Sequence, residues 1–142
     1  MAKVVLVTGG SRGIGAAVCR KFASEGYLVA VNYEKNQDAA EKLAAEIGGR
    51  AYCADVSDEN AVSTMFDRIE AELGEVSVLV NNAGISVTGL FQDCSEVEWQ
   101  RLFGVNVGGV FHCTKRALGA MLRKQSGAIV NLSSIWGVTG AS

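Results

Sequence analysis

The sequence predicts an α/β fold built on a doubly wound parallel sheet, and three observations support this. Short runs rich in valine, isoleucine and leucine alternate with amphipathic helical stretches along the 142 residues, a pattern typical of a sheet that helices cover on both faces. Four glycines crowd into residues 9–15, where the first apolar run gives way to the first helical stretch. The connections are short, and no proline-rich linker, repeat or low-complexity tract divides the chain, so we expect one domain.

Five apolar runs are expected to form the strands, because they have strand length and do not alternate with polar residues. These runs are Val4–Thr8, Leu28–Tyr33, Ala51–Ala54, Val78–Asn81 and Ala128–Leu132. Four stretches with helical periodicity separate them. These stretches are Gly13–Ser24, Asp38–Ile47, Glu59–Leu73 and a long one from about Val97 to Arg123.

Composition and charge exclude several functional classes. Hydrophobic residues make up 49% and charged residues 20% of the chain, as in a globular protein. The formal net charge is −2, and no block of like charge predicts a nucleic-acid or membrane-binding surface. No apolar run approaches the roughly 20 residues that span a bilayer. The chain enters its first strand without a signal-peptide pattern.

The cysteines predict no metal site. Cys19, Cys53, Cys94 and Cys113 are far apart, none has CxxC spacing, and there is a single histidine, His112. We expect four reduced, buried thiols and a histidine packed within its helix. These features together favour a cytoplasmic protein.

The stretch "VTGGSRGIGAAV", from Val7 to Val18, predicts a phosphate-binding turn of the Rossmann type. The first turn of a helix offers free N–H groups and the positive end of the helix dipole to a pyrophosphate. The backbone must come close to use them, and glycine allows this because it has no Cβ and tolerates positive φ. The alternative reading is a tight turn without a ligand.

Four motifs in order resemble the short-chain dehydrogenase/reductase family. They are Thr-Gly-x-x-x-Gly-Ile-Gly at Thr8–Gly15, "NNAG" at Asn81–Gly84, "VNVGG" at Val105–Gly109 and "NLSSIWG" at Asn131–Gly137. The stretches "VVLVTGGSRGIGAAV" and "VAVNY" look most like the β-ketoacyl-[acyl-carrier-protein] reductase branch. That resemblance implies an oxidoreductase of fatty acid biosynthesis that reduces a β-ketoacyl thioester on acyl-carrier protein with NADPH.

The resemblance also implies the site residues. Ser134 would donate a hydrogen bond to the substrate carbonyl, and Asn106 would hold a water in the proton relay, with a purely structural role as the alternative. The residues implied to bind the cofactor are Gly9, Ser11, Arg12, Gly13, Ile14, Gly15, Asn32, Tyr33, Asp55, Val56, Asn82, Ala83 and Gly84.

Some of these residues have a second reading. Asp55 would contact the adenine or cap the next helix, and both roles are compatible. Asn82 is expected to shape its turn more than to touch the ligand, and Asn81 to brace neighbouring strands. Ser133 is expected to be structural, and Trp136 is a candidate for the mouth of the substrate site.

The cofactor is predicted to be NADP(H). By resemblance, Arg12 would pair with the 2′-phosphate. The end of the second strand carries Asn32 and Tyr33 where an NAD-preferring turn has an acid that binds the ribose hydroxyls. Glu34 follows at once, and it keeps NAD(H) open as the alternative.

The family's catalytic tyrosine, with a lysine four residues later, is absent from the 142 residues. Val31, Gln37 and Val56 stand four residues after the three tyrosines. We therefore expect residues 1–142 to be the cofactor-binding part of a single-domain reductase, truncated before that pair and missing C-terminal strands.

Two alternatives stay open. One is a non-catalytic nucleotide-binding or interaction module, and the other is a short-chain reductase that acts on another ketone, a sugar or a steroid. A homodimer or homotetramer is expected through the 97–123 helix. Trp99, Phe103 and Phe111 of that helix are expected in the core or at the subunit contact.

Overall fold

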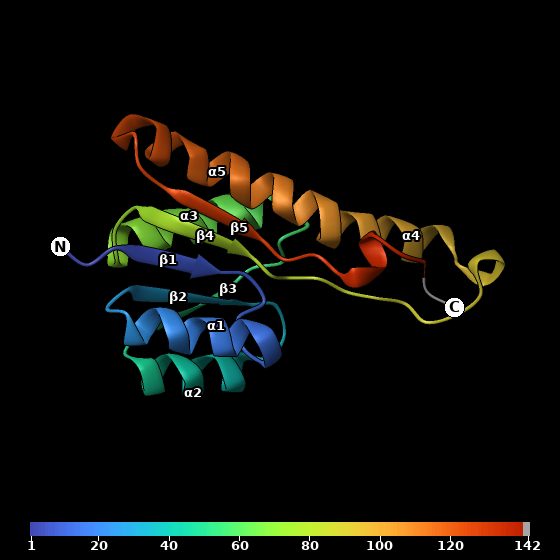
Figure 1. Cartoon of the computed structure of the whole chain (residues 1–142), viewed down its shortest axis with the longest axis horizontal. Helices are drawn as coiled ribbons and strands as arrows, with labels where there is room; N and C mark the ends of the chain where they lie inside the picture. The colour runs from blue at the N-terminus through green and yellow to red at the C-terminus, as the bar shows by residue number, and fades with distance from the viewer. Residues whose placement is uncertain (141–142) are drawn as a thin grey trace.

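The computed structural model describes residues 1–140, which form a five-stranded sheet with every neighbouring pair parallel. The strands are β1 (Val4–Val7), β2 (Leu28–Tyr33), β3 (Arg50–Cys53), β4 (Val76–Asn81) and β5 (Ala128–Asn131). Their order in the sheet is β3-β2-β1-β4-β5 (Figure 1). The predicted doubly wound parallel sheet is confirmed. The order of strands changes direction between β1 and β4, where ligands bind in this class of fold.

Helices cover both faces of the sheet (Figure 1). They are α1 (Gly13–Ser24), α2 (Gln37–Ile47), α3 (Glu59–Glu72), α4 (Glu96–Phe103) and α5 (Gly109–Lys124), with the shorter segments η1 (Phe91–Asp93), η2 (Gly104–Gly108) and η3 (Ile135–Gly137). Asn36, Asp58 and Ser95 cap the starts of α2, α3 and α4 by accepting hydrogen bonds from backbone N–H groups. Such caps each contribute about 1 kcal/mol to stability.

The core has two halves, one on each face of the sheet, and β1 supplies both. Val5 and Val7 belong to the half beneath α1 and α2, while Val4 and Leu6 belong to the half beneath α3 and α5. All four side chains are buried. This follows from the alternation of side chains along a strand and explains why the predicted strands showed no polar alternation. Full burial of each such side chain contributes about 1.5–3 kcal/mol.

The single helix expected from Val97 to Arg123 is wrong in one respect. Its middle, Gly104–Gly108, is π-helical and joins α4 to α5. The segment is rich in glycine, and at Gly109 the helix passes so close to the loop after β3 that a Cβ would lie 2.6 Å from Val56 Cγ2. Periodicity alone could not reveal this interruption, because the helical path continues on both sides of it.

Other predictions of burial are also corrected. Cys19 and Cys113 are buried, but Cys53 is exposed and Cys94 is intermediate. Cys53 ends β3, an edge strand whose outer side no other strand of residues 1–140 covers.

Trp99, Phe103 and Phe111 are 45%, 50% and 58% exposed, so they lie outside the core of residues 1–140. A subunit contact through these side chains stays a prediction. Within residues 1–140, no helix combines the length and the apolar character that crossing a membrane requires.

Candidate functional site

A cleft of about 600 Å³ lies over the carboxyl ends of the strands, next to the point between β1 and β4 where the order of strands changes direction. Every residue predicted to bind the cofactor lines it, although these residues come from four separate stretches of the sequence. Glu34, Lys35, Asn36, Ala54, Ile85 and Val105 complete the lining. Ser134 and Asn106 are not part of the lining.

Two glycines allow the segments that line the cleft to pack closely, where a Cβ would collide with the neighbouring segment. Gly9 has φ +58°, and a Cβ on it would lie 2.9 Å from Ala83 Cα. A Cβ on Gly15 would lie 2.5 Å from Gly9 O and 2.6 Å from Asn82 Nδ2. The turn after β1, the start of α1 and the loop after β4 therefore approach one another more closely than residues with side chains allow.

Thr8 and Asn82 hold those two loops together. The buried hydroxyl of Thr8 accepts hydrogen bonds of 3.0 Å from the N–H groups of Asn82 and Ala83. The Asn82 amide in turn donates to the carbonyl oxygens of Thr8 and Gly9, both at 3.0 Å. Both hydrogen bonds that the Asn82 amide donates therefore go to the glycine turn. This agrees with the expectation that Asn82 shapes the turn more than it touches a ligand.

Asn32 supports the glycine turn from below. Its Oδ1 accepts a hydrogen bond from Gly9 N at 3.1 Å, and its Nδ2 donates to Ala54 O at 3.1 Å. The side chain is 2% exposed. A buried amide with its groups satisfied by backbone is a structural brace, so Asn32 positions the turn through its side chain.

The start of α1 suits a phosphate. Its first N–H groups lack partners within the helix and carry the positive end of the helix dipole. A Cβ on Gly13 would meet nothing within 4 Å, so the cleft is open here. Arg12 precedes the helix and lines the cleft, its side chain exposed. No carboxylate within residues 1–140 forms an ion pair with Arg12, so its guanidinium is available to an anionic ligand.

Two carboxylates, those of Glu34 and Asp55, also line the cleft. Arg101 of α4 contacts both: its guanidinium lies 2.9 Å from Glu34 Oε1 and 2.7 Å from Asp55 Oδ2. The other oxygen of Asp55 accepts from the N–H and hydroxyl of Ser57. Burial acts to raise the pKa of Asp55, but the hydrogen bonds from Ser57 and Arg101 outweigh it and hold the pKa below its ordinary value. Asp58 caps α3 in place of Asp55.

Asn106 lies in the π-helical segment and binds the loop after β4. Its Oδ1 accepts from Ile85 N and its Nδ2 donates to Ile85 O, both at 2.8 Å. Gly84 lies beside this contact, because a Cβ there would be 3.4 Å from Asn106 Oδ1. The structure thus shows a bridging role for Asn106. The water-holding role that the family implies stays a prediction.

Ser134 follows β5 at the same edge of the sheet and begins η3. Its Oγ accepts a hydrogen bond from Trp136 N at 3.2 Å, and the residue is exposed. The hydroxyl hydrogen can therefore be donated to a ligand. Asn81 ties β4 to β5 and α5, because its amide donates to Asn131 Oδ1 at 2.9 Å and to Thr114 Oγ1 at 3.2 Å. Asn81 thus braces the strand that carries Ser134, as predicted.

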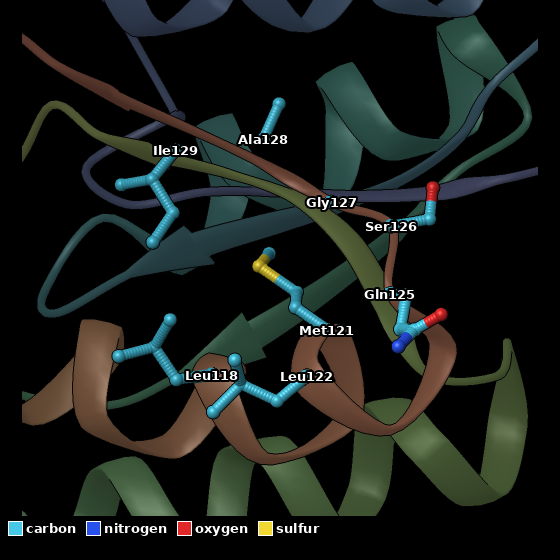
Figure 2. Close-up of a pocket in the computed structure, with 8 residues that line it drawn as sticks. All are labelled: Leu118, Met121, Leu122, Gln125, Ser126, Gly127, Ala128 and Ile129. Carbon is cyan, nitrogen blue, oxygen red and sulfur yellow. The ribbon is translucent and has the colours of Figure 1, made fainter.

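A second hollow, of about 560 Å³, lies between the end of α5 and the start of β5 (Figure 2). Leu118, Met121 and Leu122 line one side and residues 125–129 the other. Its polar side chains are an amide and a hydroxyl, those of Gln125 and Ser126, so it contains no acid or base for catalysis. Gly127 is required here, because a Cβ on it would lie 2.4 Å from Met121 Cγ.

Sequence reasoning missed Arg101. The charged faces of amphipathic helices usually contact solvent, and nothing in "EVEWQRLF" distinguishes this arginine from such a residue. Its partners lie 46 and 67 residues earlier in the chain. Lys35 and Asn36 were also missed as lining residues, although they directly follow the predicted end of β2.

Comparisons with known proteins agree with this geometry. The family model for short chain dehydrogenases matches residues 3–142. The chain is 43% identical over 145 residues to a 3-oxoacyl-[acyl-carrier-protein] reductase FabG of Staphylococcus aureus (strain Mu50 / ATCC 700699), with 99% of this chain and 59% of the relative covered. It is also 43% identical over 137 residues to an acetoacetyl-CoA reductase of Paracoccus denitrificans, covering 96% of this chain and 57% of the relative. The chain thus spans less than two thirds of the length of these relatives.

Proposed function

The chain belongs to the short-chain dehydrogenase family, and from this premise we propose that these residues form the cofactor-binding part of an NADPH-dependent carbonyl reductase. The observation that carries the proposal is the cleft itself. Gly9 and Gly15 let the turn after β1, the start of α1 and the loop after β4 pack more closely than a Cβ would allow. The cleft that these segments line lies at the N-terminus of α1. When bound there, the cofactor would supply the hydride for reduction of a carbonyl.

We propose NADP(H) as the cofactor. Arg12 lines the cleft as a cation with no carboxylate partner within residues 1–140. Asn32 and Tyr33 occupy the strand end where an NAD-preferring protein has an acid. The residues that would hold the pyrophosphate are the turn from Gly9 to Gly15, and Asp55 has a carboxylate at the adenosine end.

The proposed substrate is a 3-oxoacyl thioester. Two relatives are named for such compounds, one carried on acyl-carrier protein and the other on coenzyme A. We propose that Ser134 donates its hydroxyl hydrogen to the substrate's ketone oxygen as negative charge develops there. In this proposal Asn106 holds the loop that contains Gly84 and Ile85 beside the reacting groups.

The remaining acid–base chemistry requires a tyrosine and a lysine. None of Tyr27, Tyr33 and Tyr52 has a lysine four residues later. We propose that the pair belongs to the protein outside residues 1–142, where it would protonate the product alkoxide and bind the nicotinamide ribose.

We also propose a homodimer or homotetramer that forms through α4 and α5. Large apolar side chains are exposed at intervals of four residues from α4 through η2 to the start of α5, and exposed apolar surface marks interaction sites. They are Trp99, Phe103, Val107 and Phe111. The cytoplasmic location stays a prediction from the sequence.

The test of the function is a ketone-dependent oxidation assay. The full-length protein is mixed with NADPH and acetoacetyl-CoA, then with a 3-oxoacyl thioester on acyl-carrier protein. Oxidation of NADPH that depends on the thioester is expected, and the ratio of kcat/KM values identifies the preferred carrier. Tight NADPH binding without turnover of either thioester would contradict the proposed substrate, and the absence of NADPH binding would contradict the proposal as a whole.

A further inference from the structure

The two acids at the adenosine end of the cleft pose a problem for an NADPH site. Glu34 and Asp55 both line the cleft. A 2′-phosphate carries close to two negative charges, and carboxylates nearby would repel it. A free carboxylate at the end of β2 would also bind the ribose hydroxyls and favour NADH.

Arg101 changes the charge of this end of the cleft. The four charged residues that line the cleft are Arg12, Lys35, Glu34 and Asp55, and their charges cancel. Arg101 is not itself among the lining residues, and its guanidinium contacts one oxygen of each acid. With Arg101 included, the formal net charge of these five residues is +1.

The contacts of Arg101 are built from several elements. Its Nη1 donates to Asp55 Oδ2 at 2.7 Å and to Ser57 Oγ at 2.8 Å, while its Nη2 donates to Glu34 Oε1 at 2.9 Å. The arginine side chain is 35% exposed and the two acids are 40% and 32% exposed. Because the group is partly withdrawn from water, screening by solvent is weaker than for a pair on the open surface.

We propose that Arg101 is a positioning residue that determines cofactor specificity, because it neutralises Glu34 and holds its carboxylate away from the ribose hydroxyls. This inference rests on the proposed function, in that the cleft must bind a nicotinamide dinucleotide. Arg12 would then attract the 2′-phosphate from the glycine turn, and Arg101 would remove the repulsion from the opposite side. Glu34 was the reason to keep NAD(H) as the alternative cofactor. Once Arg101 neutralises it, Glu34 is compatible with NADP(H).

The test measures the dissociation constants of NADPH and NADH by calorimetry in the full-length protein. Arg101→Met should lower the preference for NADPH over NADH about tenfold or more, since it exposes the charge of Glu34. The double variant Arg101→Met with Glu34→Gln should recover most of that preference, because the carboxylate is then gone. A merely structural arginine would weaken both cofactors alike and leave their ratio unchanged.

Arg116→Met is the matched control. Arg116 of α5 binds Asp67 and Glu70 of α3 in a similar fork, but it lies outside the cleft. Its loss should lower the melting temperature and keep the cofactor ratio within about twofold.

Two outcomes separate the inference from the proposed function. In the first, the wild-type protein binds both cofactors and Arg101→Met does not change the ratio of their dissociation constants. This result overturns the role of Arg101 and leaves the proposed function standing. Wild-type protein that binds neither cofactor overturns both. If Arg101→Met does not fold, Glu34→Gln alone decides. It should raise the preference for NADPH about threefold, because Arg101 then keeps Asp55 as its carboxylate partner and the net charge of the group rises by one. An unchanged ratio refutes the inference.

Discussion

β1 and β5 are parallel strands, and a polar motif follows the carboxyl end of each. Their surroundings differ. β1 lies in the middle of the sheet and all four of its residues are buried, whereas β5 lies at the edge and three of its four residues are exposed. The glycine turn after β1 is tied to β2 and β4 by the hydrogen bonds of Asn32, Thr8 and Asn82. After β5, the Ser134 hydroxyl has one hydrogen-bond partner within residues 1–140, because its Oγ accepts from Trp136 N.

The difference shows which part of the proposed site is held in position by contacts within residues 1–140. The proposed pyrophosphate site depends on close backbone approach and on buried polar groups with their partners satisfied, and residues 1–140 provide both. Such a preformed site binds without a large cost of ordering. The Ser134 motif, by contrast, is exposed through residues 133–140. Changes near β1 should therefore affect binding, and changes after β5 should affect turnover.

The largest expected effect is at Gly15, which tests the β1 side of the comparison. In Gly15→Val, the side chain would overlap Gly9 O and Asn82 Nδ2, and the overpacking should destabilise the protein by about 1–3 kcal/mol. NADPH binding should fall more than about a hundredfold, because the turn must move away from its phosphate-binding position. Calorimetric titration measures the binding and thermal unfolding the stability.

Gly119→Ala controls for the general effect of a helix glycine. A Cβ on Gly119 would lie 3.6 Å from its nearest neighbour, Arg123 Nη1, which is ordinary contact. This variant should keep NADPH binding and gain about 0.5–1 kcal/mol of stability. A Gly15→Val protein with normal affinity would show that the close approach is not needed for the cofactor.

The next effect tests the β5 side. Ser134→Ala in the full-length protein should lower kcat about a hundredfold, because the hydrogen bond to the developing alkoxide is lost. The dissociation constant of NADPH should be unchanged, since Ser134 does not line the cleft. Steady-state kinetics and calorimetry on the same preparation measure both quantities. Ser133→Ala is the matched control and should keep kcat within about threefold; near-normal turnover of Ser134→Ala would remove the serine from the mechanism.

A smaller effect is expected at Arg12, again on the β1 side. Arg12→Ala should weaken NADPH about tenfold and NADH by less than twofold, because a charge-assisted contact with the 2′-phosphate is lost. Arg20→Ala is the control, since Arg20 of the same helix pairs with Glu46 of α2 outside the cleft. Equal weakening of the two cofactors by Arg12→Ala would place the 2′-phosphate elsewhere.

Much of this fold was predictable because the signals are local. β2 and α1 match their predicted bounds, and the other strands differ by one or two residues at one end or, for β3, by one residue at both ends. Short apolar runs predict strands, and the glycine cluster predicts a turn, each from only a few residues of sequence. The family resemblance drawn from the four motifs is confirmed by the family-model match.

The features that escaped prediction depend on distant partners. The π-helical segment is linked to Ile85, 21 residues before Asn106, and Arg101 acts on residues of two other loops. The exposure of Cys53 follows from its place on an edge strand, which the order of strands decides. Apolar composition around a cysteine predicts burial only where the strand is central.

The smallest expected effect concerns the thiol beneath the glycine turn. Cys19 lies under Gly10, and burial raises the pKa of its thiol to about 12. Because the folded protein holds this proton more tightly than the unfolded chain does, the thiol's contribution to stability is complete below about pH 9 and is lost as the pH rises toward 12. The free energy of unfolding, measured by denaturant titration across this range, should therefore fall with rising pH, and less steeply in Cys19→Ala. Identical slopes in wild type and Cys19→Ala would mean that the packing beneath the turn opens to solvent, which would weaken the contrast between the buried β1 side and the exposed β5 side.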